Sequence, residues 1–449
     1  MKAKYEEIMD WIKQQLHHGE LYAGNKLPSI RQLALTFNCS KNTVLKAYDE
    51  LEKEHIIYAK SKSGHYIVSH VKQTPAPSET IDFLSAGPAK DLIPYTEFQH
   101  CLNKAIDTYK EELFEYGDPQ GLVSLRQEIV QQLQSLQVFT TTERVVITSG
   151  SQQALHLLAT LPFPNNKQTI LIEQPTYFGM INAIQLSGAS VMGIPVTMDG
   201  VDLQQLETIF QQQTIKFFYV IPRFHNPLGH SYTNAEKKKI VELANQYDVY
   251  IVEDDFLGAL DTNNKADSIF SYDPSGRVIY IQSYSKTFLP GMRIASVVLP
   301  QCLIESFLRY KISADFTSPI LSQGALELYL KSGLYSTHLA KIQHIYAHKM
   351  AILQESCARL LPKSVRYTTP TSGFYLTLYL PKEVSAKRLT EELAKRHIIV
   401  DHCDRMFLHG HNSDKLIRLC ISQLEEQQIV DGVKGISEAI TRLVVRCSY

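Results

Sequence analysis

The chain has 449 residues, enough for roughly two to four domains with sizeable cores. Its net charge of −1 excludes a protein that is basic throughout, although residues 1–70 carry ten Lys and Arg against eight Asp and Glu. Seven cysteines are scattered without a CxxC pair, which disfavours both a disulfide framework and a zinc site. The apolar runs are too short to cross a membrane, and the N-terminus lacks the pattern of a signal peptide. The composition therefore predicts a soluble cytoplasmic protein.

Residues 1–70 predict three helices followed by a β-hairpin. Apolar residues at helical spacing, from Tyr5 to Leu16, predict the first helix. Ser29 and Ser40 can cap two further helices, which are separated only by the short turn FNCS. Two β-rich runs around KSKSG then predict a hairpin. This order is that of a winged helix-turn-helix, whose second helix enters the major groove of DNA.

The predicted third helix would present polar side chains, among them Lys46, near its N-terminus, where they can donate to phosphates and base edges. The alternative is a small helical cap whose Lys and Asn side chains only face solvent. The stretch LPSIRQLA, with Ser40, Tyr48 and Gly64, resembles the DNA-binding domain of GntR-type bacterial regulators over residues 3–70. That resemblance implies a set of residues facing double-stranded DNA: Ser29, Arg31, Lys41, Asn42, Thr43, Lys62, Gly64 and His65.

Residues 71–80, VKQTPAPSET, are the clearest boundary in the sequence. Two prolines, small polar residues and the lack of hydrophobic periodicity predict a linker. An extended segment of this length spans at most about 33 Å, so the parts at 1–70 and 81–449 would stay close to each other.

Residues 81–449 alternate strand-like and helix-like segments. Apolar runs such as RVVIT, TILIE, IKFFYVI, VYIVED and RVIYIQS are separated by helical patterns such as AEKKKIVELANQY. The alternation predicts an α/β fold with a mostly parallel sheet covered by helices. Ligands bind such sheets at the carboxyl ends of the strands, so the residues that follow each strand are the first candidates for a site.

Chemically distinctive residues follow five of these strands. The turn SGSQQA opens a helix whose free N–H groups suit a phosphate. The residues that follow the other four strands are Tyr177, Asn226, Asp254 with Asp255, and Ser283, Ser285 and Lys286 with Arg293 beyond. A phosphate cradle, an aromatic ring, an amide, a carboxylate and a lysine near an arginine together predict a pyridoxal-phosphate site.

In such a site, the amine of Lys286 forms an imine with the cofactor's aldehyde, and the carboxylate keeps the pyridine nitrogen protonated. Burial and neighbouring positive charge would lower the pKa of the lysine. Each feature alone has an ordinary interpretation as a turn, a loop, a capping carboxylate or a core tyrosine. The prediction depends on their joint occurrence at successive strand ends.

The same region resembles a known enzyme family. YGDPQGLVSLRQEI, TSGSQQAL, EQPTYFG, HNPLG, EDDF, SYSKTFLPGMRIA, TSGFYL and IRLCIS resemble a fold-type I aminotransferase over residues 81–449. A GntR-type head on such a body is the arrangement of the MocR family of bacterial regulators, and the whole chain is similar to that family. The resemblance implies a smaller α/β subdomain beside the main sheet, and pyridoxal phosphate as the cofactor.

The resemblance also implies roles for individual residues. Lys286 would form the imine, and Arg418 would hold the carboxylate of an effector or substrate, unless it is simply an exposed strand arginine. Tyr116 would reach the phosphate bound to a neighbouring subunit, which requires a homodimer. The cofactor-binding residues implied in this way are Tyr116, Ser151, Gln152, Tyr177, Asn226, Asp254, Ser283, Lys286 and Arg293.

One position departs from the family pattern. Many relatives have a tyrosine shortly after the carboxylate, which donates to the ring oxygen of the cofactor. The motif EDDF places Phe256 there, and phenylalanine cannot donate a hydrogen bond. Asn226 can compensate for this loss.

The choice of effector would depend on three segments, 81–95, 223–232 and 400–412. Arg223, His225, His402 and His409 are candidates to line its pocket, although histidines at such places are more often structural.

The main hypothesis is a pyridoxal-phosphate-dependent transcriptional regulator that senses an amino compound, or the cofactor itself, at Lys286. The alternative is a working aminotransferase that carries a DNA-binding head, because the sequence contains the residues that transamination needs. A third hypothesis, a winged-helix interaction module on an inactive scaffold, requires that Lys286 hold no cofactor. The sequence identifies neither the effector nor the operator.

Overall fold

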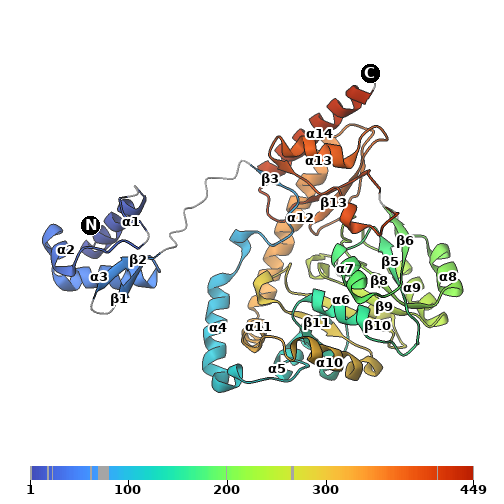
Figure 1. Cartoon of the computed structure of the whole chain (residues 1–449), viewed down its shortest axis with the longest axis horizontal. Coiled ribbons are helices and arrows are strands. Elements are labelled where there is room, and N and C mark those ends of the chain that lie inside the picture. Colours follow the sequence, from blue (N-terminus) through green and yellow to red (C-terminus); the bar gives the residue numbers. More distant parts are fainter. Residues whose placement is uncertain are drawn as a thin grey trace. The chain divides into compact units, whose positions relative to one another are not determined.

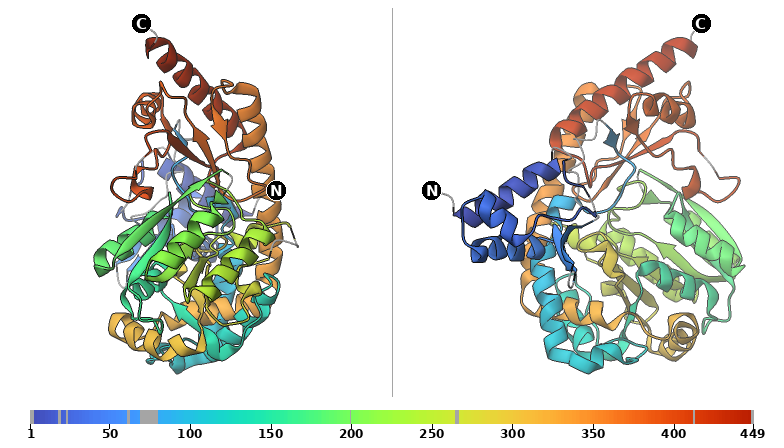
Figure 2. Two further views of the ribbon diagram at one scale, coloured as in Figure 1. Left: turned by 90° about the vertical axis from the view of Figure 1, so that its right-hand side faces the viewer. Right: turned by 60° about the vertical axis from the view of Figure 1, so that its left-hand side comes forward.

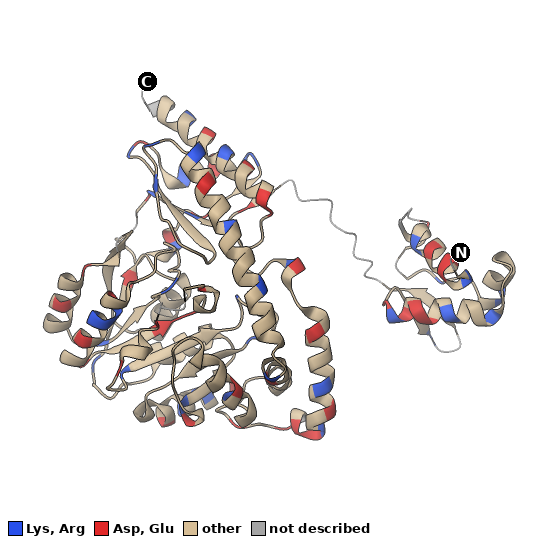
Figure 3. Ribbon diagram, turned by 180° about the vertical axis from the view of Figure 1, so that it is seen from behind, with Lys and Arg blue, Asp and Glu red and all other residues tan. Residues whose placement is uncertain are grey.

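The computed structural model describes residues 3–17, 20–22, 24–60, 63–68, 80–198, 200–263, 267–411 and 413–447. The chain divides into two compact units, Met1–Glu79 and Thr80–Tyr449, called here the head and the body (Figure 1). Lys62 and linker residues 71–79 lie outside the described residues. Within the described part of the chain, no helix is long and apolar enough to span a membrane. Both signs of charge are distributed over the helices of each unit (Figure 3).

The described residues of the head form three helices and one two-stranded antiparallel sheet, as the sequence predicts. Ser29 and Ser40 are the N-caps of the second and third helices, and their hydroxyls accept hydrogen bonds from the backbone N–H groups of Gln32 and Thr43. Ile8, Val44 and other apolar residues from all three helices and both strands form one buried core. The elements of the head are α1 (Lys4–His17), α2 (Ile30–Thr36), α3 (Lys41–Lys53), β1 (Ile57–Lys60) and β2 (Gly64–Ile67).

The body is built on an eight-stranded sheet in the order β4-β11-β10-β9-β8-β5-β6-β7. The pairs from β10 through β9, β8 and β5 to β6 are parallel, whereas β11 is antiparallel to both of its neighbours and β7 is antiparallel to β6. The mostly parallel sheet is therefore confirmed. Its strands are β4 (Val145–Thr148), β5 (Thr169–Gln174), β6 (Val191–Thr197), β7 (Gly200–Val201), β8 (Ile215–Val220), β9 (Tyr250–Asp254), β10 (Val278–Ser283) and β11 (Ala295–Val298).

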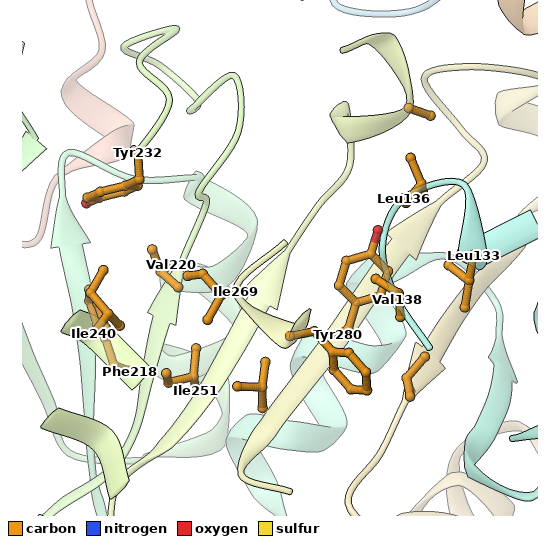
Figure 4. Packing of buried hydrophobic residues seen from close by; sticks show 14 of the residues in the cluster. Leu133, Leu136, Val138, Phe218, Val220, Tyr232, Ile240, Ile251, Ile269 and Tyr280 are labelled. Atoms are coloured by element: carbon orange, nitrogen blue, oxygen red, sulfur yellow. The ribbon is translucent and has the colours of Figure 1, made fainter. Parts of the chain in front are cut away.

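Side chains on these strands alternate between two hydrophobic cores. Phe217 and Tyr219 of β8 belong to one core, and Phe218 and Val220 belong to the other. Successive side chains of a strand point to opposite faces, so a run that is apolar throughout must be covered on both faces. Figure 4 shows the second core, where Phe218 and Val220 lie near Ile240 of the covering helix α9 (Asn234–Gln246).

Helices cover both faces of the sheet and link it to the rest of the body. They are α4 (Tyr95–Tyr109), α5 (Val123–Gln134), α6 (Ser151–Thr160), α7 (Phe178–Ser187), α8 (Leu203–Gln212), α9, α10 (Gln301–Asp315), α11 (Ile320–Lys331) and α12 (Leu334–Leu360). In the views of Figure 2, the long helix α12 extends from the main sheet region to the C-terminal part of the body.

A smaller α/β subdomain forms the C-terminal part of the body, as predicted. Its three-stranded antiparallel sheet has the order β12-β13-β15, and a short parallel pair joins β14 to β3 near the start of the body. These elements pack around a third core, with α12 contacting α14. The elements are β3 (Ile81–Asp82), β12 (Arg366–Tyr367), β13 (Tyr375–Tyr379), α13 (Ala386–Ala394), β14 (Ile398–Ile399), β15 (Leu416–Cys420) and α14 (Glu426–Cys447).

Candidate functional site

A cavity of ≈ 300 Å³ lies in the body at the carboxyl ends of β9 and β10. It brings together nine of the ten residues predicted to hold cofactor or effector: Ser151, Gln152, Tyr177, Asn226, Asp254, Ser283, Lys286, Arg293 and Arg418. The remaining wall residues are Leu84, Ala86, Phe178, Phe256, Ser285, Tyr375 and Arg405.

The N-terminus of α6 and Arg293 form one end of the cavity. Ser151 is the first residue of α6, and its N-cap Gly150 has a φ of 85°, a backbone conformation that favours glycine. A Cβ atom at Gly150 would lie 2.5 Å from Nη2 of Arg293, so a larger residue there would displace the guanidinium group. A helix N-terminus facing a guanidinium group is suited to a phosphate.

Tyr177 forms another wall and is held by contacts with its neighbours. It is the N-cap residue of α7, and its hydroxyl donates to Oε1 of Gln152 at 3.2 Å. The side-chain amide of Gln152 donates in turn to the backbone oxygen of Gly179 at 2.8 Å. A Cβ atom at Gly179 would come within 2.4 Å of the Tyr177 ring, so the ring packs directly over the backbone there.

Asp254 is the buried carboxylate of the cavity. Its Oδ2 accepts a hydrogen bond from the Tyr219 hydroxyl at 2.7 Å, while Oδ1 is buried without a hydrogen-bond partner among the described residues. Burial raises the pKa of Asp254 to about 7, although the Tyr219 hydrogen bond opposes the rise. An unpartnered buried acceptor of this kind fits a ligand that supplies an N–H donor, such as a protonated pyridine ring.

Lys286 follows β10 and reaches into the cavity. Its Nζ donates to the backbone oxygen of Ala86 at 2.5 Å. Burial lowers its pKa, and the positive charges of Arg418 and Arg293 lower it further, while Cys420 has the opposite effect. A larger fraction of the amine is therefore unprotonated at neutral pH than for a lysine in water, as attack on an aldehyde requires.

Arg418 of β15 also lines the cavity, and its side chain is 3% exposed. Its Nη1 donates to Oδ1 of Asn226 at 3.0 Å, and its Nη2 lies 2.9 Å from Oδ2 of Asp401. Nε of Arg418 is buried without a partner among the described residues. The alternative of an exposed strand arginine is therefore wrong, and the free Nε suits a bound carboxylate.

Several residues of the cavity wall were not anticipated from the sequence. They include Leu84, Ala86 and Arg405, which lie in the segments 81–95 and 400–412 that were expected to govern effector choice. Phe178 and Tyr375 lie within the motifs EQPTYFG and TSGFYL, but nothing in the sequence singled them out as cavity residues.

Four other candidates do not line the cavity: Arg223, His225, His402 and His409. Arg223 forms a buried ion pair with Asp255, and Nε2 of His225 lies 3.2 Å from buried Glu173. Within the turn that carries Asn226, Nδ1 of His225 accepts a hydrogen bond from the backbone N–H of Leu228 at 3.3 Å.

Tyr116 lies outside the cavity wall. Its side chain is 86% exposed, and its ring packs edge-on against Phe316 with ring centroids 5.3 Å apart. The role expected for it, contact with a neighbouring subunit, stays a prediction.

The residues expected to face DNA occupy the surface of the head. Ser29, Arg31, Lys41 and Asn42 are exposed, whereas Thr43 is half-buried and its hydroxyl hydrogen-bonds with Ser40 at 2.9 Å. These positions leave the α3 N-terminus accessible.

Two of the residues predicted to face DNA from the wing are less exposed. Gly64 and His65 are half-buried in β2, and the His65 ring packs on Tyr48 at a centroid distance of 4.6 Å. Lys46 lies over the Tyr5 ring at 4.0 Å, an intramolecular contact that holds its amine beside α1. Lys62 is outside the described residues.

The fold and the cavity together define a fold-type I aminotransferase body that follows a winged-helix head. Family models match both parts: "Bacterial regulatory proteins, gntR family" at residues 4–67, and "Aminotransferase class I and II" at residues 85–436. The chain therefore belongs to the aminotransferase class I and II family with a gntR-type head, the arrangement of the MocR regulators.

Individual relatives agree with this assignment. The chain is 42% identical to the uncharacterised HTH-type transcriptional regulator YcxD of Bacillus subtilis, over 96% of this chain and 98% of that one. It is 26% identical to the HTH-type transcriptional regulator NorG of Staphylococcus aureus, over 88% and 94% of the two chains. Among solved structures, the α-aminoadipate aminotransferase LysN of Thermus thermophilus, complexed with N-(5'-phosphopyridoxyl)-L-leucine, has a TM-score of 0.75 and 28% identity, over 82% and 94%.

The cofactor of this fold family is pyridoxal phosphate, and the residues of the cavity fit it. The helix N-terminus with Arg293 suits the phosphate, the unpartnered oxygen of Asp254 suits the ring nitrogen, and the buried amine of Lys286 suits the aldehyde.

Proposed function

We propose that this protein is a pyridoxal-phosphate-dependent transcriptional regulator that senses an amino compound, or the cofactor itself, through a covalent bond to Lys286. The observation that carries the proposal is one cavity that combines Lys286, the unpartnered oxygen of Asp254 and the buried Arg418, in a chain with a gntR-type head. When bound, the cofactor supplies an aldehyde that reacts with amines and a ring that withdraws electrons.

Different residues of the cavity bind different parts of the cofactor and the ligand. Ser151, Gln152, Ser283 and Arg293 bind the phosphate, and Tyr177 packs on the ring. Burial destabilises the ionised form of Asp254, and a nearby positive charge stabilises that form. A protonated ring nitrogen would supply this charge, and Asp254 would keep the proton on that nitrogen by accepting its hydrogen bond.

The opposite side of the cavity binds the ring oxygen and the ligand. Asn226 donates to the ring oxygen, a role for which Phe256 has no hydrogen-bonding group. The guanidinium group of Arg418 binds the ligand's carboxylate, as its free Nε allows.

The head binds double-stranded DNA through α3 and the wing. The exposed side chains of Arg31, Lys41 and Asn42 contact phosphates and base edges in the major groove. Ser29, the N-cap of α2, and Thr43, which hydrogen-bonds with the α3 N-cap Ser40, also face the backbone of the DNA. Lys62, Gly64 and His65 approach it from the wing.

The protein works as a cytoplasmic homodimer, associated with the nucleoid through its DNA. Tyr116, with its exposed ring, reaches the phosphate site of the neighbouring subunit. Two heads then read two half-sites. The ligand changes DNA affinity only if it binds one arrangement of the dimer more tightly than the other.

The experiment uses the full chain and a double-stranded DNA selected by the cofactor-loaded protein from a random library. DNA affinity is measured at one fixed salt concentration, with and without cofactor and with a panel of amines, for the wild type and for Lys286→Ala. The proposal expects the wild type to respond and the variant to lose the response while it still binds DNA. Equal affinity under all conditions would remove the sensing role.

A second candidate function is transamination, which the likeness to the aminotransferase LysN favours. Incubation with an amino donor and a keto acid separates the two functions, since an enzyme gives sustained turnover. A single exchange of the bound cofactor without further product is the behaviour expected of a sensor.

A further inference from the structure

Arg405 lies in the cavity wall and takes no part in the cofactor contacts proposed above. It belongs to the short 3-10 helix η7 (Asp404–Met406). Its guanidinium group lies over the Phe178 ring at 4.4 Å, and its Nη2 donates to Oδ2 of Asp401 at 2.9 Å. These two contacts fix the group, while the side chain is still 49% exposed and can be reached by a ligand that comes from solvent.

Asp401 connects Arg405 to Arg418. Nη2 of Arg418 also lies 2.9 Å from Oδ2 of Asp401, so the two Nη2 atoms are at most twice that distance apart. A backbone hydrogen bond of 2.8 Å from Arg418 to Asp401 keeps the carboxylate beside β15. Two guanidinium groups therefore line one cavity at a separation that a short molecule with two carboxylates can bridge.

The charges of the cavity favour such a ligand. The ionisable side chains in the described wall are Lys286, Arg293, Arg405 and Arg418 on the positive side and Asp254 on the negative side, apart from Tyr177 and Tyr375, which stay neutral at pH 7. Lys286, Arg293 and Asp254 face the cofactor in the proposed arrangement.

The two arginines that remain share one carboxylate. Burial raises the pKa of Asp401, but the charges of Arg418 and Arg405 outweigh it and keep this pKa below its usual value, so Asp401 is ionised at neutral pH. One positive charge is left in excess. A free amino acid with an acidic side chain carries one net negative charge, whereas an amino acid with a neutral side chain carries none, so the former complements the cavity.

We infer that Arg405 is a specificity-determining residue that binds a second acidic group, and that the effector class is α-amino acids with a carboxylate in the side chain. Arg418 binds the α-carboxylate and Arg405 binds the side-chain carboxylate. This inference rests on the proposed function, because it assigns the ligand of the same cavity.

The test titrates the cofactor-loaded full chain with L-glutamate and L-aspartate, and with their neutral counterparts L-glutamine and L-asparagine. Binding is followed by the visible absorption of the cofactor and by calorimetry, for wild type, Arg405→Gln and Arg405→Lys. The wild type should bind one acidic amino acid about tenfold or more tightly than its amide, a preference that corresponds to one charge-assisted hydrogen bond. Arg405→Gln should reduce the ratio of the two affinities, acid over amide, to about one. Arg405→Lys should keep part of the preference for the acid.

The ratio of acid to amide is the decisive quantity, because loss of Arg405 also leaves Asp401 to Arg418 and weakens every α-carboxylate alike. Equal binding of acid and amide by the wild type, or an unchanged ratio in Arg405→Gln, would overturn the inference and leave the proposed function standing. If no amine changes the spectrum of a protein that visibly holds cofactor, the proposed function fails and the inference fails with it.

Discussion

In the head, Arg31, Lys41 and Asn42 lie exposed on the surface, whereas in the body Arg418 and Asp401 are 3% and 6% exposed and pair within a cavity wall. The same chemical groups act under different conditions in the two units. A solvated charge is screened and weak by itself, so the head needs many contacts and its binding must depend on salt. A desolvated charge interacts strongly with few partners, so the body can recognise a small molecule with a few groups.

The largest effect should follow the loss of Lys286. Lys286→Ala removes the amine that attacks the aldehyde, so cofactor affinity should fall on the order of a thousandfold, or about 4 kcal/mol. Equilibrium dialysis with the visible spectrum measures this change. Lys331→Ala, an exposed lysine at the end of α11, is the matched control and should leave cofactor binding unchanged. Equal losses in both variants would contradict a special role for Lys286.

Removal of Arg418 tests whether the buried charges of Arg418 and Asp401 interact strongly, unlike the solvated charges of the head. Arg418→Gln leaves the buried Asp401 with only Arg405, so the free energy of unfolding should fall by about 3 kcal/mol. The control is Arg396→Gln, which breaks the ion pair between Arg396 and Glu438, 26% and 49% exposed, and should cost less than about 1 kcal/mol. Urea denaturation of the cofactor-free chain compares the two losses, and similar values would break the contrast between buried and solvated pairs.

The buried carboxylate Asp254 gives the body a pH dependence. Because its pKa is raised to about 7, the folded state holds its proton more tightly than the unfolded state, and stability falls as pH rises from about 4 to 7. Asp254→Asn removes this cost but leaves part of a buried amide without a partner, so the cofactor-free protein should gain about 2 kcal/mol at pH 8, with the gain shrinking toward pH 4. Thermal or urea unfolding across this range measures it. If the stabilisation by Asp254→Asn is the same at every pH, the pKa of Asp254 is not raised in the folded state.

The smallest effect is expected in the head. Lys41→Gln should weaken DNA binding about threefold to tenfold and reduce the salt slope by about one, without a change in cofactor binding. Lys53→Gln, at the other end of α3 and paired with Glu50, is the control and should leave the slope unchanged. Affinity measured at several salt concentrations decides between them, and a cofactor effect of Lys41→Gln would contradict the separation of roles.

The sequence by itself predicted the elements whose patterns are local. Apolar spacing and the caps Ser29 and Ser40 defined the head, and the alternation of strand-like and helix-like segments predicted a mostly parallel sheet covered by helices. The short strands β3, β7 and β14 carried no periodicity and were missed, because two residues are too few to form a pattern.

The same distinction separates the two halves of the cavity wall. Asp254, Ser283 and Lys286 could be placed from the sequence, since parallel strands bring their carboxyl ends to one edge of the sheet. The positions of Arg405 and Asp401 beside Arg418, and of Ala86 beside Lys286, were decided only by the tertiary structure. Irregular segments have no repeat that fixes the direction of a side chain, so packing between distant parts of the chain determines which charges meet.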